Sequence, residues 1–221
     1  MRSSLRTPAA LMSVGVLAVG LAACSKSSDS SSSSSASSAP ATSASSKPSP
    51  MAQIATLTGV DTQVTLDPST AAALKSLNVT VAPVAPATAK VVGGDTIAAF
   101  PITGGNVQIY DKSVNPFITG KVTHSGGLMF SAGGKTLAAT NFIVDPGTSM
   151  LTATVGGSQV PLLALDGTNV QITKSGANVV LTGTVAKLTK TAADALNMTF
   201  GVTAFKEGIP LGKVQLTAAG S

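Results

Sequence analysis

The chain offers few side chains that could carry chemistry. Its 221 residues include one cysteine, one histidine, one tyrosine and no tryptophan. These three residues are Cys24, His124 and Tyr110. Zinc sites, thiol redox pairs and disulfide frameworks each need more cysteines or histidines than that. The sequence therefore excludes those classes, and we expect no metal site.

The common catalytic signatures are also missing from the sequence. It contains no G-x-S-x-G, S-x-x-K, H-E-x-x-H or P-loop motif. A serine-histidine-acid site would have to use His124, and glycan hydrolysis needs two carboxylates about 5 to 9.5 Å apart. The carboxylates stand in structural contexts instead: Asp67 precedes a predicted helix, and Asp145 and Asp166 begin turn-forming sequences. We expect a protein that is not an enzyme, with a hydrolase of envelope polymers as the last alternative.

The N-terminus has the layout of an export signal. Arg2 and Arg6 precede an uncharged, largely apolar run over residues 9–23. At about 1.5 Å per helical residue this run is too short for the roughly 30 Å hydrocarbon layer of a membrane. It ends in a Leu-Ala-Ala-Cys sequence that resembles the bacterial lipobox. The resemblance implies cleavage between Ala23 and Cys24 and a diacylglyceryl group on the Cys24 thiol. The alternative is an ordinary secretory signal with a free cysteine.

A serine-rich segment follows the predicted cleavage site. Of the 26 residues from 25 to 50, fifteen are serine, and such a composition forms no core. We predict three parts: a signal peptide over 1–23, a lipidated and disordered tether over 24–50, and a folded domain over 51–221. Because two acyl chains hold a protein stably on a membrane, the predicted location is the extracytoplasmic face of the cell membrane. The lysines are scattered, so we expect no nucleic-acid partner.

The residue pattern of the domain predicts antiparallel strands. Apolar and polar residues alternate in segments such as 106–110 and 213–217, and five Gly-Gly pairs, typical of hairpin turns, separate the runs. Two short helices are predicted, over Ser69–Leu77 with Asp67 as its N-cap, and over Thr191–Leu196. The expected fold class is all-β, mainly an antiparallel β-sandwich or open barrel, with two short helices.

One part of the domain resembles a known family. Residues 122–130 combine a strand, His124, a small residue, Gly-Gly and an aromatic strand, and segments 100–105, 141–144 and 160–163 accompany it. Together they resemble the actinobacterial secreted haem-transport (HtaA-type) domain and uncharacterised actinobacterial lipoproteins related to it. The resemblance implies a β-rich fold and, in the haem-transport members, an iron-ligating tyrosine with a histidine hydrogen-bonded to it. His124 matches the position of that histidine.

Two functions are expected on these grounds. The first is a non-catalytic binding or scaffolding domain at the cell envelope, with an envelope protein or polysaccharide as partner and no cofactor. The alternative is capture of haem or another porphyrin near His124, with Tyr110 as the other candidate ligand-binding residue. Strand alternation predicts that these two side chains face different directions. A simpler role for His124 is to hydrogen-bond the turn beside Gly126.

Overall fold

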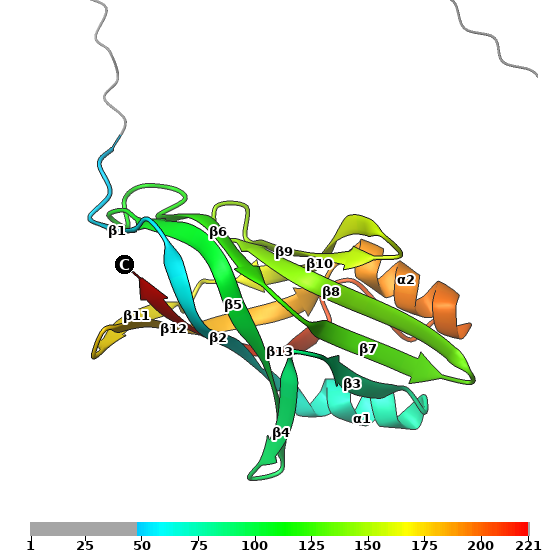
Figure 1. Ribbon diagram of the computed structural model, residues 1–221. Helices are drawn as coiled ribbons and strands as arrows, with labels where there is room; N and C mark the ends of the chain where they lie inside the picture. The colour runs from blue at the N-terminus through cyan, green and yellow to red at the C-terminus, as the bar shows by residue number, and fades with distance from the viewer. Residues whose placement is uncertain (1–47, 221) are drawn as a thin grey trace, which may run out of the picture. The chain divides into compact units, whose positions relative to one another are not determined.

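The alternation of apolar and polar side chains builds thirteen strands in the part of the chain that the structure describes, residues 48–220. The structure is a computed structural model (Figure 1). The predicted signal peptide, its cleavage site and Cys24 lie outside the described residues, as does most of the predicted tether. The strands are β1 (Ala52–Ile54), β2 (Leu57–Leu66), β3 (Thr80–Val84), β4 (Thr88–Val92), β5 (Asp95–Ile109), β6 (Ile118–His124), β7 (Gly127–Ala132), β8 (Lys135–Asp145), β9 (Met150–Val155), β10 (Ser158–Asp166), β11 (Gln171–Ser175), β12 (Asn178–Leu188) and β13 (Pro210–Gly220).

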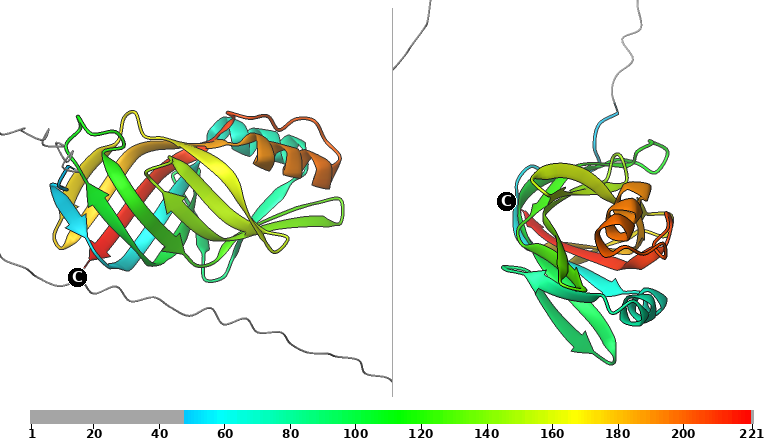
Figure 2. Two further views of the ribbon diagram at one scale, coloured as in Figure 1. Left: turned by 90° about the horizontal axis from the view of Figure 1, so that it is seen from above. Right: turned by 90° about the vertical axis from the view of Figure 1, so that its right-hand side faces the viewer.

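Eight of these strands close into an antiparallel barrel. Around the ring they run β5, β2, β13, β12, β10, β9, β8 and β6, and β6 closes the ring because it pairs with both β5 and β8. The barrel is seen along its length and from one end in Figure 2. The predicted mostly antiparallel β class with two helices is confirmed, and the arrangement is a closed barrel.

The other five strands extend the barrel wall. β1 and β4 each pair with part of β5, and β11 pairs with β12. β7 pairs with the first part of β8, and β3 pairs with the outer edge of β7. The long strands β5 and β8 therefore project beyond the ring as two β-sheet arms, one carrying β4 and the other carrying β7 and β3.

The two helices lie at one end of the barrel (Figure 2). Helix α1 (Pro68–Ser76) begins where predicted, because the Asp67 carboxylate accepts hydrogen bonds from the first backbone amides and proline occupies the first helical position. Helix α2 (Lys190–Phe200) is longer than the predicted Thr191–Leu196. It continues to Gly201, whose left-handed conformation ends the helix. No helix among the described residues is long and apolar enough to cross a membrane.

Three of the five Gly-Gly pairs form hairpin turns, between β4 and β5, β7 and β8, and β9 and β10. Gly104-Gly105 instead lies within β5, at a shift of register against β6. Gly126-Gly127 lies where β6 gives way to β7. A Cβ atom on Gly105 would stand 2.0 Å from the carbonyl oxygen of Lys121, so glycine is required there by the close approach of a neighbouring strand.

Candidate ligand-binding site

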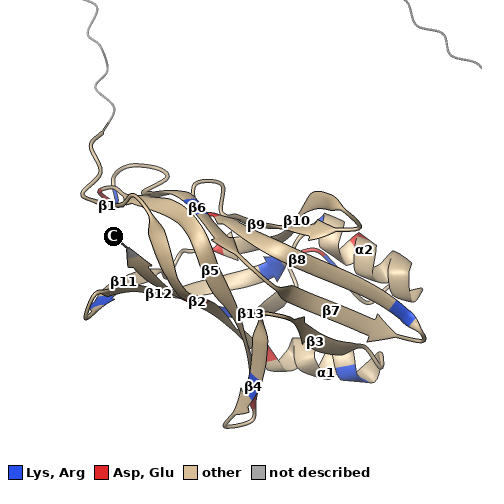
Figure 3. Cartoon of the chain, viewed as in Figure 1, with Lys and Arg blue, Asp and Glu red and all other residues tan. Residues whose placement is uncertain are grey.

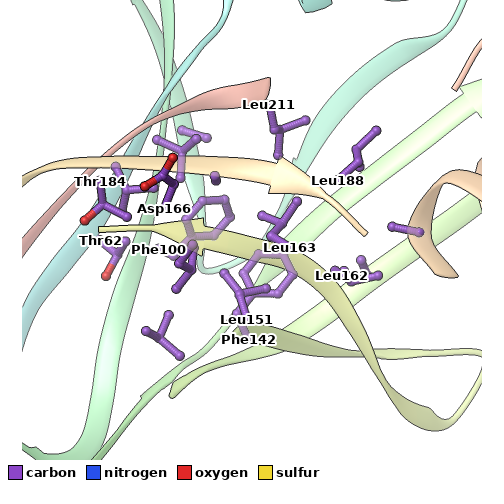
Figure 4. Close-up of a pocket in the computed structure, with 18 of the residues that line it drawn as sticks. Thr62, Phe100, Phe142, Leu151, Leu162, Leu163, Asp166, Thr184, Leu188 and Leu211 are labelled. Atoms are coloured by element: carbon purple, nitrogen blue, oxygen red, sulfur yellow. The ribbon is translucent and has the colours of Figure 1, made fainter. Parts of the chain in front are cut away.

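A cavity of about 820 Å³ occupies the inside of the barrel (Figure 4). Every strand of the eight-strand ring contributes side chains to its wall, and both helices contribute at one end. The alternation along each strand explains this wall, because every second residue of a strand points into the barrel. Most of these residues are leucine, valine, alanine or phenylalanine. A cavity of this size and apolarity is typical of small-molecule sites, which occupy about 300–1,000 Å³.

Two phenylalanines meet within the cavity. The ring centroids of Phe100 on β5 and Phe142 on β8 lie 4.9 Å apart, and the planes meet at 74° in an edge-to-face arrangement. Both rings are labelled in Figure 4. Such a geometry places the positive edge of one ring against the negative face of the other. The two rings form an aromatic part of the cavity wall.

His124, the last residue of β6, lies in the cavity wall and is 5% exposed. Its Nδ1 atom lies 3.1 Å from the carbonyl oxygen of Phe142, and its Nε2 atom lies 2.7 Å from the hydroxyl oxygen of Thr62. A carbonyl oxygen only accepts hydrogen bonds, so Nδ1 donates to it. In the neutral ring Nε2 then carries the lone pair and accepts a hydrogen bond from the hydroxyl of Thr62.

Burial lowers the pKa of His124 from its ordinary value of 6.5, because an imidazolium ion is poorly solvated inside the barrel. The hydrogen bond to the backbone of Phe142 opposes this shift and is the smaller effect. The ring is therefore neutral at physiological pH. Its hydrogen bonds join β6 to β2 and to β8. From the sequence we considered a structural role in which His124 bonds the turn beside Gly126; its partners lie on these two strands instead.

Tyr110 lies away from this site. It follows β5, and its hydroxyl donates a hydrogen bond to the side-chain oxygen of Gln108 at 2.9 Å. Its backbone pairs with Phe117, just before β6 begins, whereas His124 ends the same strand. At about 3.3 Å per residue the two ends of β6 are roughly 20 Å apart. The structure therefore does not bring Tyr110 and His124 together, and Tyr110 is not among the residues that line the cavity.

One carboxylate, Asp166, is among the residues that line the cavity. Its side chain accepts hydrogen bonds from Lys187 at 2.8 Å and from the hydroxyl of Thr168 at 2.6 Å. These contacts, with that to Lys187 the strongest, hold the pKa of Asp166 well below its usual range. A single carboxylate that is ionised at neutral pH is not the acid-base pair that glycan hydrolysis needs.

Thr62 is the site residue that the sequence did not reveal. A threonine that takes the place of an apolar residue in an alternating strand gives no signal of its own. Only the folded barrel shows that Thr62 is 3% exposed and that its hydroxyl is hydrogen-bonded to the one histidine. Among the described residues no three His, Cys, Asp or Glu side chains come together as a metal site.

Comparison with known proteins gives a weak structural resemblance. No family model and no curated protein matches the sequence. The C-terminal domain of HtaA from Corynebacterium glutamicum is similar with a TM-score of 0.46 and 13% identity, over 74% of this chain and 98% of that one. The haem-binding protein HtaB from the same organism is similar with a TM-score of 0.37 and 16% identity, over 77% of this chain and 96% of that one.

Proposed function

We propose that the domain binds an apolar or amphipathic small molecule inside the barrel. The observation that carries this proposal is the cavity of about 820 Å³ with a wall of mainly aliphatic and aromatic side chains. Transfer of apolar surface from water into such a wall contributes about 25 cal/mol for each Å² removed. Under this proposal the domain is a binding module whose ligand lies inside the barrel.

A fluorescent apolar probe, N-phenyl-1-naphthylamine, tests this function. We expect its emission to rise on mixing with the full chain, and a competing long-chain fatty acid to reverse the rise. Thr184→Phe places a large ring in the cavity and should weaken probe binding by roughly tenfold, about 1.4 kcal/mol. Thr182→Phe, on the same strand but not in the cavity wall, is the matched control. No binding by the folded wild-type protein would refute the proposal.

Haem, the ligand of the Corynebacterium protein HtaB, is a second candidate. The observation in this chain that favours it is the tautomer of His124: Nδ1 is held by a carbonyl oxygen, and Nε2 carries a lone pair. Iron-binding imidazoles usually have this arrangement. The residues fit haem if the Thr62 hydroxyl turns away from Nε2. Bound haem would supply an iron atom that His124 holds.

Titration with haemin separates the two candidates. Under the haem reading the Soret band shifts on binding, Thr62→Val keeps the shift because Nε2 remains free to ligate, and His124→Ala loses it. Under the general apolar reading haemin either fails to bind or binds without any Soret change that depends on His124. Probe displacement measured in the same samples shows whether haemin enters the cavity at all.

We further propose that Cys24 anchors the protein to the cell membrane. Support comes from the basic, apolar and lipobox-like sequence that ends at Cys24 and from the serine-rich segment after it. Wild-type protein expressed in a bacterial host should fractionate with membranes, and intact mass should show a lipid-modified N-terminus. Cys24→Ser should abolish the modification. An unmodified wild-type chain released into the medium would refute the anchor without affecting the proposal about the cavity.

A further inference from the structure

The exposed residues that line the cavity fall mainly into two groups of different chemistry. One group lies at the loop end of the barrel and is mostly polar; the other lies on β3, β4 and β5 and is mostly apolar. The first contains Lys112, Asn115, Pro116, Ser149, Gly167 and Thr168. The second contains Val81, Pro83, Ala89 and Thr96.

The second group marks a gap in the barrel wall, which we call the seam. β6 joins β5 to β8, but it ends at His124. Beyond that point the arm of β5 ends in β4, and the arm of β8 ends in β7 and β3. β3 and β4 form no ladder with each other, and Figure 1 shows them running apart. The seam is this gap between β3 and β4.

The narrow end of the seam is held shut by backbone contacts. The turn from β3 to β4 is closed by a hydrogen bond from the amide of Ala87 to the carbonyl of Val84. A Cβ atom on Gly126 would stand 2.5 Å from that amide nitrogen and 2.6 Å from that carbonyl oxygen. The turn therefore packs tightly against the end of β6, and the seam widens away from it, toward the start of β3 and the end of β4.

A second hollow, of about 400 Å³, lies at the wide part of the seam. Helix α1, the start of β3 and the start of β5 surround it. Four residues, Leu66, Leu74, Val81 and Thr96, line both this hollow and the barrel cavity. The outer hollow therefore adjoins the inner one, with these four side chains at their boundary. Val81 points into the cavity and is nevertheless 37% exposed, because no strand covers it.

We infer that the seam is the entrance through which the acyl chain of a membrane lipid passes into the barrel. This inference rests on the proposed function and names its ligand class. An acyl chain crosses an apolar opening without losing hydrogen bonds, whereas the polar loop end would have to give up its water. The rim of the seam is apolar too: on β4, Val91 and Val92 are 70% and 52% exposed.

The charges near the seam suit the surface of a membrane. Lys90 on β4 and Lys75 on α1 are exposed on either side of it, and Asp95, at the start of β5, is the acidic residue beside them. Charged residues are otherwise few over the described domain (Figure 3). Exposed apolar side chains flanked by lysines are the combination with which proteins lie on lipid headgroups. With the seam lying on the headgroups, an acyl chain that leaves the bilayer would enter the seam directly.

The chain contains no tryptophan, so one introduced tryptophan both narrows the seam and reports on it. Ala89→Trp places an indole in the seam, in the cavity wall. Ala82→Trp is the matched control, because Ala82 is an exposed residue of β3 that does not line the cavity. The full chain is mixed with phosphatidylcholine vesicles that contain a spin-labelled long-chain fatty acid, and stopped-flow fluorescence follows the transfer. Circular dichroism first confirms that each variant folds.

We expect Ala89→Trp to slow both uptake and release of the fatty acid by roughly tenfold relative to Ala82→Trp, because the indole narrows the opening. An indole that only took up cavity volume would instead weaken binding by speeding release, and a merely structural effect would lower the melting temperature. Thr96→Trp, on β5 beside β4 and therefore on the same side of the seam, should act in the same way if Ala89→Trp fails to fold. Thr168→Trp, in the cavity wall at the loop end, should slow neither step relative to Ala82→Trp, which lies outside the wall and serves as the reference.

Two outcomes would overturn the inference and differ from a failure of the proposed function. If Thr168→Trp slows exchange and the seam variants do not, the loop end is the entrance. If the seam variants exchange at the rate of Ala82→Trp, the seam does not limit access. In both cases the wild-type protein still binds the fatty acid. A wild-type protein that binds neither fatty acid nor the apolar probe refutes the proposed function itself.

Discussion

The hydroxyl of Thr62 reaches Nε2 of His124 across the face of β5, the strand that separates β2 from β6. The hydrogen bond is 2.7 Å long and both residues are buried, at 3% and 5% exposure. With the bond from Nδ1 to Phe142, it ties three strands of the barrel together just where β6 ends and the two arms part. His124 thus stabilises the barrel at the point where the closed ring gives way to the separate arms of β5 and β8.

Thr62→Val removes the donor and leaves Nε2 buried without a partner. An unsatisfied buried polar group destabilises a fold by about 1–3 kcal/mol, so we expect the free energy of unfolding to fall by that amount. Thr62→Ser keeps the hydroxyl and should lose about 1 kcal/mol, the value of one buried methyl group. Urea denaturation of the two variants measures both. Equal losses would show that the hydrogen bond does not matter.

Acidification should destabilise the domain through His124. Below pH 6.5 the unfolded chain binds a proton on this residue, while the folded chain, whose His124 pKa is lowered by burial, does not. The contribution of neutral His124 to the free energy of unfolding is therefore fully present above pH 6.5. It falls as the pH drops below 6.5, by up to about 1.4 kcal/mol per pH unit. His124 is the only histidine, so His124→Gln should lack this slope between pH 7 and 5.5. Urea midpoints at each pH test this, and parallel curves would refute it.

The edge-to-face pair of Phe100 and Phe142 should contribute beyond its apolar area. Single replacement of either ring by leucine is expected to destabilise the domain by roughly 1–2 kcal/mol, because part of the ring volume is kept. The double variant should lose less than the sum of the two, by about 0.5–1.5 kcal/mol, which is the interaction energy of such pairs. A double-mutant cycle in urea measures this coupling; strict additivity would show that the rings do not interact.

Local signals in the sequence were sufficient for most elements of the fold. Alternation identified most of the strands, although not β4, and the Asp67-Pro68 pair marked the start of α1, because each of these signals acts within a few residues. Closure of the barrel was not predictable. It depends on β6 pairing with β8 as well as with β5, and no residue of β6 carries a signal for that second partner. A sandwich and a barrel present the same alternation.

The candidate site was predictable only in part. His124 drew attention as the single histidine, and it does lie in the wall of the cavity. Tyr110 drew attention in the same way, yet it lies outside the wall, because position along a strand and not residue type decides what faces the barrel. The cavity itself had no sequence signal. Leucine and valine on alternating positions predict a buried face equally well whether that face is packed or hollow.

Gly105 shows why a Gly-Gly pair is an ambiguous signal, and it allows a direct test. The residue has a φ of 123°, and a Cβ atom on it would meet the backbone of Lys121 at 2.0 Å. Gly134 also has a positive φ, of 76°, but a Cβ atom there would meet nothing within 4 Å.

We expect Gly134→Ala to lower the free energy of unfolding by about 1–2 kcal/mol from backbone strain alone. Gly105→Ala should lose at least about 2 kcal/mol more, because β5 and β6 must also move apart. Thermal and urea denaturation of the two variants measure the difference, and similar losses would show that β5 and β6 are farther apart than described. Since β6 carries His124 and closes the ring, Gly105→Ala should also weaken probe binding in the cavity, whereas Gly134→Ala, at the tip of the β7–β8 hairpin, should leave it unchanged.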